Sequence, residues 1–490
     1  MKLRRIYLLF KPIGLLLIIS AAAILVHGYH PYVEDAEIYV PGIKQKLNPT
    51  LYPYNSEFFA SHARLTFFPN LIAESVRIAH LPAEWTLLLW HFFSIFLLLL
   101  ACWHVGRLCF DNSEAHWGGV ALVASLLTIP VAGTALYIMD QYLNTRSLST
   151  PCVLFIVSST LERKVLRASL WTVFTALIHP LMVVFGLTYA LLLWLGRRPR
   201  ESHSGFAKAL ALLPLGLFPS ATDTYRQVME SHSYFFLSRW EWYEWLGIFA
   251  PLALLWWFRR IAIKQELPVL DLMCRGLIWF GGFYFALAMV ITVVPSVINL
   301  AKLQPMRSLH LLYVLFFIFA GGLLAKFVLR DRVWMWLLLF VPLCVGMFYA
   351  QRQLFPATAH IEWPNSGSSN DWVGAFEWVR DNTPVDAYFA LNPDYMELPG
   401  ADQHGFRAIA ERSRLADRIK DSGVVTMFPR LAETWKQQVE AQNGWKSLEA
   451  ADFRRLQKQF GVNWIVLEQP GLPDLNCPYK NKRLVVCSIR

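Results

Sequence analysis

The sequence predicts a mainly α-helical membrane protein, in which a bundle of about eleven transmembrane segments precedes a small α/β domain. The first observation is composition, since 55% of the 490 residues are hydrophobic and only 16% are charged. Soluble domains usually carry about 25% charge. The second is that apolar residues gather in long runs before residue 350, and charged residues become frequent after it. The third is that Lys and Arg in the first part lie mostly in short segments between those runs.

The apolar runs define the expected membrane segments, because a helix needs roughly 20 mostly apolar residues to cross a bilayer. Several of the predicted segments are short: 6–27, 86–105, 117–139, 150–160, 168–178, 179–196, 207–222, 246–258, 276–296, 309–327 and 333–350. The first follows a basic N-terminus without a small-x-small cleavage motif. We therefore expect an uncleaved helix there rather than a signal peptide.

The basic loops predict the orientation, because cytoplasmic loops carry an excess of Lys and Arg. Alternate loops contain Lys2, Arg4 and Arg5; Arg107; Arg163, Lys164 and Arg167; Arg197, Arg198 and Arg200; Arg259, Arg260, Lys264 and Arg275; Lys326, Arg330 and Arg332. The N-terminus is therefore expected inside and the C-terminal domain outside. The net charge of +10 then reflects membrane topology, so no nucleic-acid partner is expected.

A break is expected within the apolar stretch 168–196. One long helix there would place Arg197 outside, against the charge rule, whereas a break at His179-Pro180 returns it to the inside. Pro180 also removes a backbone donor from a helix. We therefore expect two short helices forming a hairpin, and irregular backbone at membrane depth usually lines a cavity. His179 could bind a phosphate or an acceptor there, or its neutral ring could bond a carbonyl that Pro180 leaves free.

The polar C-terminal part is expected to form its own domain. The predicted boundaries are a membrane domain at 1–350 with its first external loop at 28–85, a linker at 351–370 and an extracytoplasmic domain at 371–490. The linker ends in a flexible Pro-Asn-Ser-Gly-Ser-Ser-Asn run. Helical patterns alternate with apolar strands, which favours an α/β fold, at 371–382, 387–391, 450–460, 463–467 and 483–489. This part contains no phosphate loop, zinc signature or nucleophile elbow in its sequence.

Two of the seven cysteines differ from the rest. Five lie in or beside apolar segments, and none forms a CxxC pair. Cys477 and Cys487 lie in the polar C-terminal region on either side of a predicted turn. They could form a disulfide if that region lies in an oxidising compartment.

The first external loop holds the main candidates for chemistry, in the run His30-Pro-Tyr-Val-Glu-Asp-Ala-Glu-Ile-Tyr-Val-Pro-Gly. Glu34 and Asp35 follow the first membrane helix by a few residues and should lie near the membrane surface. A carboxylate there could act as general base toward an acceptor hydroxyl. The pair could instead hold a divalent cation against a phosphate, or complement the dipole of a helix at 34–46.

Later external loops add polar candidates. Asp140 could complete a metal or acceptor site and Arg146 could hold a donor phosphate, or the two could simply pair with each other. Lys302, Gln304 and Arg307 precede segment 309–327, at the depth where a lipid phosphate would lie. A guanidinium binds phosphate through two parallel bonds, although these cations could also only anchor the helix by snorkelling.

The acidic pair, the many membrane segments and the external domain together resemble the GT-C superfamily of glycosyltransferases, in a bacterial branch. This resemblance implies hexosyl or pentosyl transfer from a polyprenyl-phosphate-linked donor to a glycan, lipid or protein acceptor at the bacterial cytoplasmic (inner) membrane. It implies Asp35 as the catalytic residue with Glu34 beside it. It also implies a possible Mg²⁺ or Mn²⁺ site at Asp35 and Asp140, and a basic residue such as Arg307 for the donor phosphate.

Two other classes of protein also fit the sequence. A lipid or solute transporter could use the same polar groups as a pathway, although the two halves of the sequence show no internal repeat. A non-catalytic scaffold would share the architecture without needing the acidic pair. Loss of activity on Asp35→Asn would separate an enzyme from both.

Overall fold

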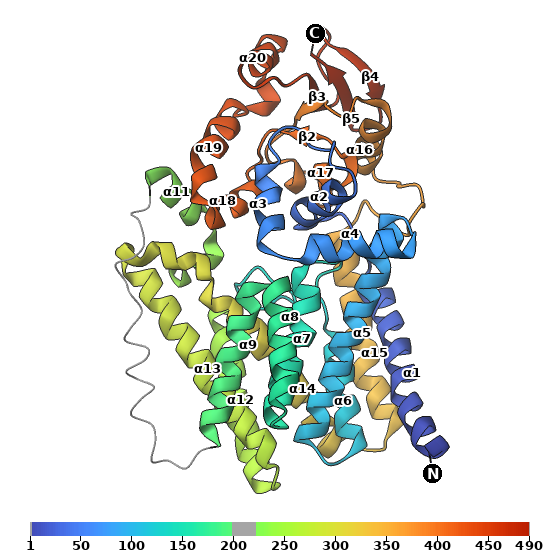
Figure 1. Cartoon of the computed structure of the whole chain (residues 1–490), viewed down its shortest axis with the longest axis vertical. Helices are drawn as coiled ribbons and strands as arrows, with labels where there is room; N and C mark the ends of the chain where they lie inside the picture. Colours follow the sequence, from blue (N-terminus) through green and yellow to red (C-terminus); the bar gives the residue numbers. More distant parts are fainter. Residues whose placement is uncertain (1, 198–221, 490) are drawn as a thin grey trace. The chain divides into compact units, whose positions relative to one another are not determined.

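The computed structural model describes residues 2–197 and 222–489, and these divide into two compact units (Figure 1). We call the first the helical unit; it comprises Met1–His27, Phe92–Asp140 and Thr145–Phe348. We call the second the α/β unit; it comprises Gly28–His91, Gln141–Asn144 and Tyr349–Arg490. The predicted segment 207–222 (all but its last residue), Arg198 and Arg200 lie outside the described residues.

Long apolar helices dominate the helical unit. Their bounds are α1 (Lys2–His27), α5 (Ala83–Cys109), α6 (Ser113–Ser125), α7 (Thr145–Leu161), α8 (Val165–Ile178), α9 (Pro180–Gly196), α12 (Trp242–Lys264), α13 (Pro268–Val293), α14 (Leu309–Leu324) and α15 (Val333–Leu354), with the first residues of α5 and the last of α15 in the α/β unit. Among the described residues, five stretches are long and apolar enough to cross a membrane: Ala83–Cys109, Trp242–Lys264, Pro268–Val293, Val297–Leu329 and Val333–Leu354. Other apolar helices are shorter, so the predicted count of eleven is not confirmed.

Glycines allow α6 and α14 to pack closely. A Cβ atom added to Gly118 would lie 2.4 Å from the carbonyl oxygen of Gly321, and one added to Gly119 would lie 2.9 Å from that of Ile318. Small residues at such positions let helix backbones approach, which is how membrane helices gain van der Waals contact without a hydrophobic driving force.

The predicted break at His179-Pro180 is confirmed. Helix α8 ends at Ile178 and α9 begins at Pro180. The guanidinium of Arg197, directly after α9, donates to the carbonyl oxygens of Thr160 (3.2 Å) and Leu161 (2.8 Å) at the end of α7. Since α8 starts four residues after α7 ends, at Val165, the end of α9 returns to the level where α8 begins, as a hairpin requires.

Several basic loops of the helical unit meet at this same end. The guanidinium of Arg275 donates to the carbonyl oxygen of Gly196 at 2.8 Å. Arg197 bonds the end of α7, as described above. Arg197 and Arg275 therefore lie at one end of the helical unit with the end of α7, and the shared side of all the basic loops stays a prediction.

The predicted segment 117–139 is helical only in its first part. Helix α6 ends at Ser125, and the chain then turns back on itself through an isolated bridge between Pro130 and Tyr137. Pro130 has no backbone N–H to donate and so cannot continue a helical ladder. The apolar character of residues 126–139 reflects burial within the helical unit rather than a helix.

A mixed five-stranded sheet forms the centre of the α/β unit (Figure 1). Its strands are β1 (Tyr388–Ala390), β2 (Ser413–Arg414), β3 (Trp464–Glu468), β4 (Asn476–Lys480) and β5 (Leu484–Ser488), in the order β2-β1-β3-β5-β4. Strand β1 runs parallel to β2 and β3, and β5 runs antiparallel to β3 and β4. The predicted strands near 387–391, 463–467 and 483–489 correspond to β1, β3 and β5.

Alternating side chains of the sheet build two apolar cores, because successive strand residues point to opposite faces. One core joins Phe389, Val466 and Val486 to helix α16 (Asp371–Asn382) and helix α17 (Phe406–Ala410). The other joins Ile465 and Val485 to helix α20 (Ala450–Phe460). The expected small α/β domain is therefore confirmed as a sheet covered by helices on both faces.

The segment that follows α1 also belongs to the α/β unit. It forms α2 (Ala36–Leu47), α3 (Glu57–Leu65) and α4 (Phe68–Ala79). The amine of Lys44 in α2 donates to the carbonyl oxygen of Ala408 at 2.8 Å, and the hydroxyl of Tyr52 donates to that of Arg407 at 2.9 Å. The first external loop and the C-terminal region therefore fold together.

A disulfide joins Cys477 on β4 to Cys487 on β5, as the sequence allowed. The two strands are neighbours in the sheet. The other five cysteines are free thiols in the helical unit, and all but Cys344 are buried. A disulfide confined to the α/β unit agrees with an oxidising compartment around it.

Candidate active site

Glu34 and Asp35 form the turn that starts α2. Glu34 adopts a left-handed backbone conformation with φ of 56°, which is uncommon outside glycine. Asp35 is the N-cap residue, yet its side chain accepts no capping hydrogen bond from the helix. Its backbone N–H donates to the hydroxyl of Tyr142 at 3.2 Å. The expected helix at 34–46 exists, but hydrogen-bonded capping is not what the Asp35 carboxylate does.

Both carboxylates instead contact one lysine from the C-terminal region, Lys420. Its ammonium pairs with Glu34 and lies 3.2 Å from Oδ1 of Asp35. The Lys420 side chain is 12% exposed, whereas those of Glu34 and Asp35 are 32% and 37% exposed. Burial lowers the pKa of Lys420, but the charges of Glu34 and then Asp35 outweigh it, so its pKa is raised and the amine stays charged.

Lys420 could not have been found from the sequence. It is 385 residues from Asp35 along the chain and belongs to no recognisable motif. It is the first residue of helix α18 (Lys420–Met427), an element that hydrophobic periodicity does not reveal. Only the fold brings it to the acidic pair.

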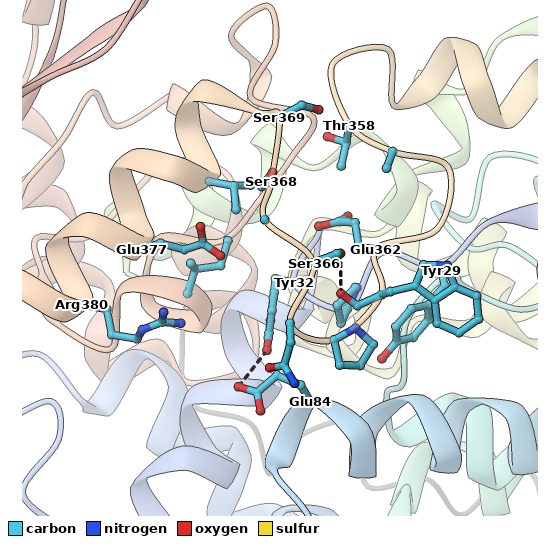
Figure 2. A pocket seen from close by; sticks show the side chains of 18 of the residues that line it. Tyr29, Tyr32, Glu84, Thr358, Glu362, Ser366, Ser368, Ser369, Glu377 and Arg380 are labelled. Atoms are coloured by element: carbon cyan, nitrogen blue, oxygen red, sulfur yellow. Dashed lines mark hydrogen bonds between the residues drawn. The ribbon is translucent and has the colours of Figure 1, made fainter.

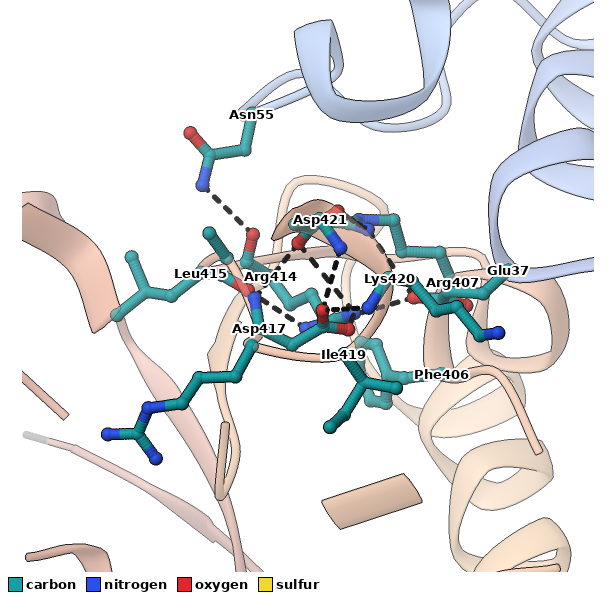
Figure 3. Close-up of polar contacts among 12 residues, drawn as sticks. Glu37, Asn55, Phe406, Arg407, Arg414, Leu415, Asp417, Ile419, Lys420 and Asp421 are labelled. Carbon is teal, nitrogen blue, oxygen red and sulfur yellow. Dashed lines mark hydrogen bonds and ion pairs between the residues drawn. The ribbon is translucent and has the colours of Figure 1, made fainter. Parts of the chain in front are cut away.

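Five fully buried charged residues lie next to this site (Figure 3). We call Glu37, Arg407, Arg414, Asp417 and Asp421 the buried ion network; their side chains are 0–2% exposed. Arg414 donates to Oε1 of Glu37 at 2.9 Å and pairs with Asp417. Arg407 binds both carboxylate oxygens of Asp421 at 2.9 Å. Such bidentate geometry is the strong form of a charged hydrogen bond.

The network holds the start of α18 in place. Oδ1 of Asp417 accepts hydrogen bonds from the backbone N–H of Lys420 at 2.7 Å and of Asp421 at 2.8 Å. Arg414 and Arg407 in turn outweigh the effect of burial, so that the pKa of Asp417 is lowered and its carboxylate stays charged. These hydrogen bonds therefore fix the position of the Lys420 backbone.

The same network reaches the acidic pair through Glu37, which follows Asp35 by two residues on α2. Oε2 of Glu37 accepts from the backbone N–H of Ala408 at 3.1 Å. A Cβ atom on Gly405 would lie 2.5 Å from this carboxylate, so the approach requires glycine at that position. The result is a closed ring of contacts within the α/β unit, which runs through the acidic pair, Glu37, Arg414, Asp417 and Lys420.

A second buried cluster in this unit joins His30, Glu362 and His404. The Glu362 carboxylate lies 2.8 Å from Nδ1 of His30 and 3.1 Å from Nε2 of His404. Burial favours neutral Glu362, but the charge of His404 and hydrogen bonds from both histidines outweigh it and lower its pKa to about 2. Burial likewise opposes charge on His404, yet Glu362 raises its pKa, whereas burial lowers the pKa of His30.

Glu362 also lines a cavity of about 330 Å³ (Figure 2). Figure 2 shows Tyr32 and Glu84 on one side, where the Tyr32 hydroxyl donates to Glu84 at 3.5 Å. Glu377 and Arg380 of α16 line another part of the wall, and the serines of residues 366–369 belong to the segment predicted as a flexible linker. The lining is thus rich in hydroxyl and carboxylate groups.

Asp140 and Arg146 lie together in the helical unit. The guanidinium of Arg146, in the first turn of α7, donates to Oδ2 of Asp140 at 2.5 Å, and both residues are buried. The alternative in which these two pair with each other is therefore present in the structure.

The remaining candidates occupy irregular backbone of the helical unit. Lys302 lies in η4 (Pro295–Leu303), Arg307 lies in η5 (Pro305–Ser308), and Gln304 between them has φ of 48°. The Arg307 guanidinium lies 5.4 Å from the centre of the Tyr234 ring, a cation–π contact. His179 lies in the break between α8 and α9, where its backbone N–H donates to the carbonyl oxygen of Thr175 at 2.7 Å.

The two carboxylates expected to bind a metal lie in different units. Asp35 belongs to the α/β unit and contacts an ammonium, whereas Asp140 belongs to the helical unit and contacts a guanidinium. Within residues 2–197 and 222–489, no group of three or more His, Cys, Asp or Glu side chains could hold a metal ion. A metal site that joins Asp35 to Asp140 stays a prediction.

Long apolar helices and a separate unit with a mixed sheet and an acidic pair define the architecture of an integral membrane protein. The chain is similar to the Archaeoglobus fulgidus oligosaccharyltransferase tethered with an acceptor peptide containing the NVT sequon, with a TM-score of 0.50 and 13% identity over 94% of this chain and 69% of that one. The apo form of the same enzyme gives a TM-score of 0.49 and 12% identity over 94% and 69% of the two chains.

A third solved structure is the archaeal oligosaccharyltransferase from Archaeoglobus fulgidus in complex with an inhibitory peptide and a dolichol-phosphate. It gives a TM-score of 0.46 and 13% identity over 93% of this chain and 69% of that one. No protein-family model and no curated protein sequence matches the chain. The match with a TM-score of 0.50 confirms the resemblance drawn from the sequence at the level of the fold.

Proposed function

We propose that the chain is a membrane glycosyltransferase that transfers a sugar from a polyprenyl-phosphate-linked donor to an acceptor outside the cytoplasm. Its fold is shared with a solved oligosaccharyltransferase that holds an acceptor peptide. The observation that carries the proposal is the acidic pair. Glu34 and Asp35 follow α1 by a few residues, remain about one-third exposed and contact Lys420, and the Asp35 side chain makes no capping hydrogen bond to α2.

In this proposal Asp35 acts as general base. An acceptor oxygen attacks the anomeric carbon of the donor while its proton passes to the Asp35 carboxylate. The bond between that carbon and the phosphate oxygen breaks, and its electron pair leaves with the polyprenyl phosphate. Attack opposite to the leaving group inverts the anomeric centre. Glu34 shares Lys420 with Asp35 and thereby fixes the position of the base.

The cations of the helical unit are the proposed holders of the donor phosphate. Arg307 is the main candidate. The ring of Tyr234 packs against its guanidinium and orients the N–H groups that would bind the phosphate. Lys302 and Gln304 precede it in the same irregular segment. Asp140 orients Arg146, which is a further proposed ligand of the same phosphate. His179 supplies a further polar group from the break between α8 and α9.

The α/β unit is the proposed site of acceptor binding. Its cavity of about 330 Å³ offers hydroxyl and carboxylate groups from Tyr32, Glu84 and Glu377, which suit a polar glycan or peptide. The disulfide between Cys477 and Cys487 supports an oxidising location for this unit, outside the cytoplasmic membrane. A protein, lipid or glycan acceptor would each meet the base at that surface.

The decisive experiment compares Asp35→Asn with wild type in proteoliposomes. A panel of polyprenyl-phosphate-linked hexoses and pentoses is supplied with peptide, lipid and glycan acceptors, and release of polyprenyl phosphate is measured. We expect release by wild type and a loss of about 100-fold or more in Asp35→Asn, since a general base contributes that much. Its unfolding temperature should be unchanged.

Asp474→Asn is the matched control, because Asp474 is an exposed turn residue of the same unit. It should transfer at the wild-type rate. If Asp35→Asn also keeps the wild-type rate, Asp35 is not the base. If donors cross the bilayer without any release of polyprenyl phosphate, the chain is a transporter, and the proposed function is wrong.

A further inference from the structure

The position of Lys420 has a consequence beyond holding two side chains. Two adjacent carboxylates repel each other, and at sites that handle phosphate a divalent cation often lies between them. Here an ammonium from the same chain contacts both Glu34 and Asp35. It is largely buried beneath them, while the carboxylates keep part of their surface in contact with solvent.

Lys420 is fixed before any ligand arrives. Its backbone N–H is held by Asp417 at 2.7 Å, and Asp417 is held by Arg414. Arg414 reaches Glu37 on the same helix that the acidic pair starts. Since every member of this ring of contacts lies in the α/β unit, the ammonium and the two carboxylates keep their geometry through that unit alone.

We propose that Lys420 is a positioning residue that takes the place of a divalent cation between Glu34 and Asp35. Its ammonium supplies one positive charge against two negative charges. The site therefore keeps a net negative charge, as a base requires, whereas a divalent ion would cancel both carboxylates. The three N–H donors of lysine suffice to bind one oxygen of each carboxylate.

The first test is Mn²⁺ binding to the purified full-length protein, measured by electron paramagnetic resonance. We expect wild type to bind Mn²⁺ weakly, because Lys420 already lies between the carboxylates. Lys420→Ala should bind it about tenfold or more tightly, since two oxygen ligands become available. Lys420→Ala combined with Asp35→Asn should lose this gain, and Lys420→Arg should not show it.

Lys436→Ala is the matched control, because Lys436 pairs at 4.0 Å with Glu440 on the surface of α19 (Ala432–Ala441), away from the acidic pair in the sequence. It should bind Mn²⁺ as wild type does. The role of Lys420 is overturned if wild type binds Mn²⁺ as tightly as Lys420→Ala. It is equally overturned if Lys420→Ala gains no binding over Lys436→Ala while the unfolding temperature shows that it is folded.

The kinetic test rests on the proposed transferase function. Wild-type release of polyprenyl phosphate should be unaffected by a chelator. Lys420→Ala should lower kcat about 100-fold with little change in KM for the donor. Lys420→Arg should recover part of kcat. A purely structural role of Lys420 would not lower kcat while leaving KM unchanged. A chelator-sensitive wild type would contradict the proposal. If no variant transfers any sugar but the Mn²⁺ pattern holds, the transferase function fails while the placement of Lys420 stands.

Discussion

Two clusters of charge lie side by side in the α/β unit and differ in one respect, their exposure. In each cluster, at least one carboxylate of the segment after α1 pairs with a cation of the C-terminal region. The carboxylates of the network are fully buried, whereas Glu34 and Asp35 are open to solvent over about a third of their surface. Of these two clusters, the acidic pair is therefore the one that solvent reaches.

The difference also sets what each cluster contributes to stability. Taking charged groups out of water costs several kcal/mol per ion, so a buried pair repays this only through good geometry, and removing one partner is strongly unfavourable. An exposed pair gains little from its contact and loses little without it. Variants of the two clusters should therefore separate stability from activity.

The largest effect is expected for Arg414→Met. This change removes the guanidinium that joins Glu37 to Asp417 and leaves buried carboxylates without their main counter-charge. We expect a loss of about 3–5 kcal/mol in the free energy of unfolding. Chemical unfolding of the full chain in detergent, followed by tryptophan fluorescence, measures it.

Arg455→Met is the control for this variant. Arg455 pairs with Asp452 on α20, and its side chain is 74% exposed. Its replacement should change stability by less than about 0.5 kcal/mol. Equal losses in the two arginine variants would show that the network does not hold the unit together.

A smaller effect is expected at the cluster of His30, Glu362 and His404. The pKa of Glu362 is depressed to about 2 from an ordinary 4.5, so its contribution to stability is present above pH 4.5 and is lost as the pH falls toward 2. The pKa of His404 is raised, so its contribution is present below pH 6.5 and is lost as the pH rises through the raised value. Stability from this cluster should therefore be greatest between those limits.

Glu362→Gln tests this expectation, because it removes the charge that both histidines face. The unfolding free energy of wild type should exceed that of the variant by roughly 2–3 kcal/mol near pH 5–6. The difference should shrink at pH 4 and at pH 8. A difference that does not vary with pH would mean that the cluster acts by packing alone, and Glu440→Gln on the surface of α19 supplies the baseline.

Much of the fold could be predicted because its signals are local. The helices at 371–382 and 450–460 have the predicted bounds, and the break at His179 follows from one proline and the charge of a loop. The prediction of a membrane helix over 117–139 was wrong beyond Ser125, because burial within protein and burial in lipid select the same apolar residues. Composition alone cannot separate those two environments.

The site could be predicted only in part, because some of its contacts join residues that lie far apart in the sequence. Glu34 and Asp35 stand next to each other in the chain and follow a recognisable helix, so their pattern is visible. Lys420 lies in a weakly patterned segment, and its partner role depends on a contact across 385 residues. The arginines of the network were likewise hidden, because a charged residue in a polar region is expected to be exposed until the fold buries it.

The smallest effects are expected within the acidic pair, where they sharpen the comparison most. Glu34→Gln and Asp35→Asn should each change stability by less than about 1 kcal/mol, because either leaves Lys420 one charged partner. The double variant should lose about 1–2 kcal/mol more than the sum, since a largely buried ammonium then lacks any charged partner at this site. Adding Lys420→Ala should recover that excess. Strict additivity would instead mean that Lys420 is bound elsewhere and that the two carboxylates do not depend on it.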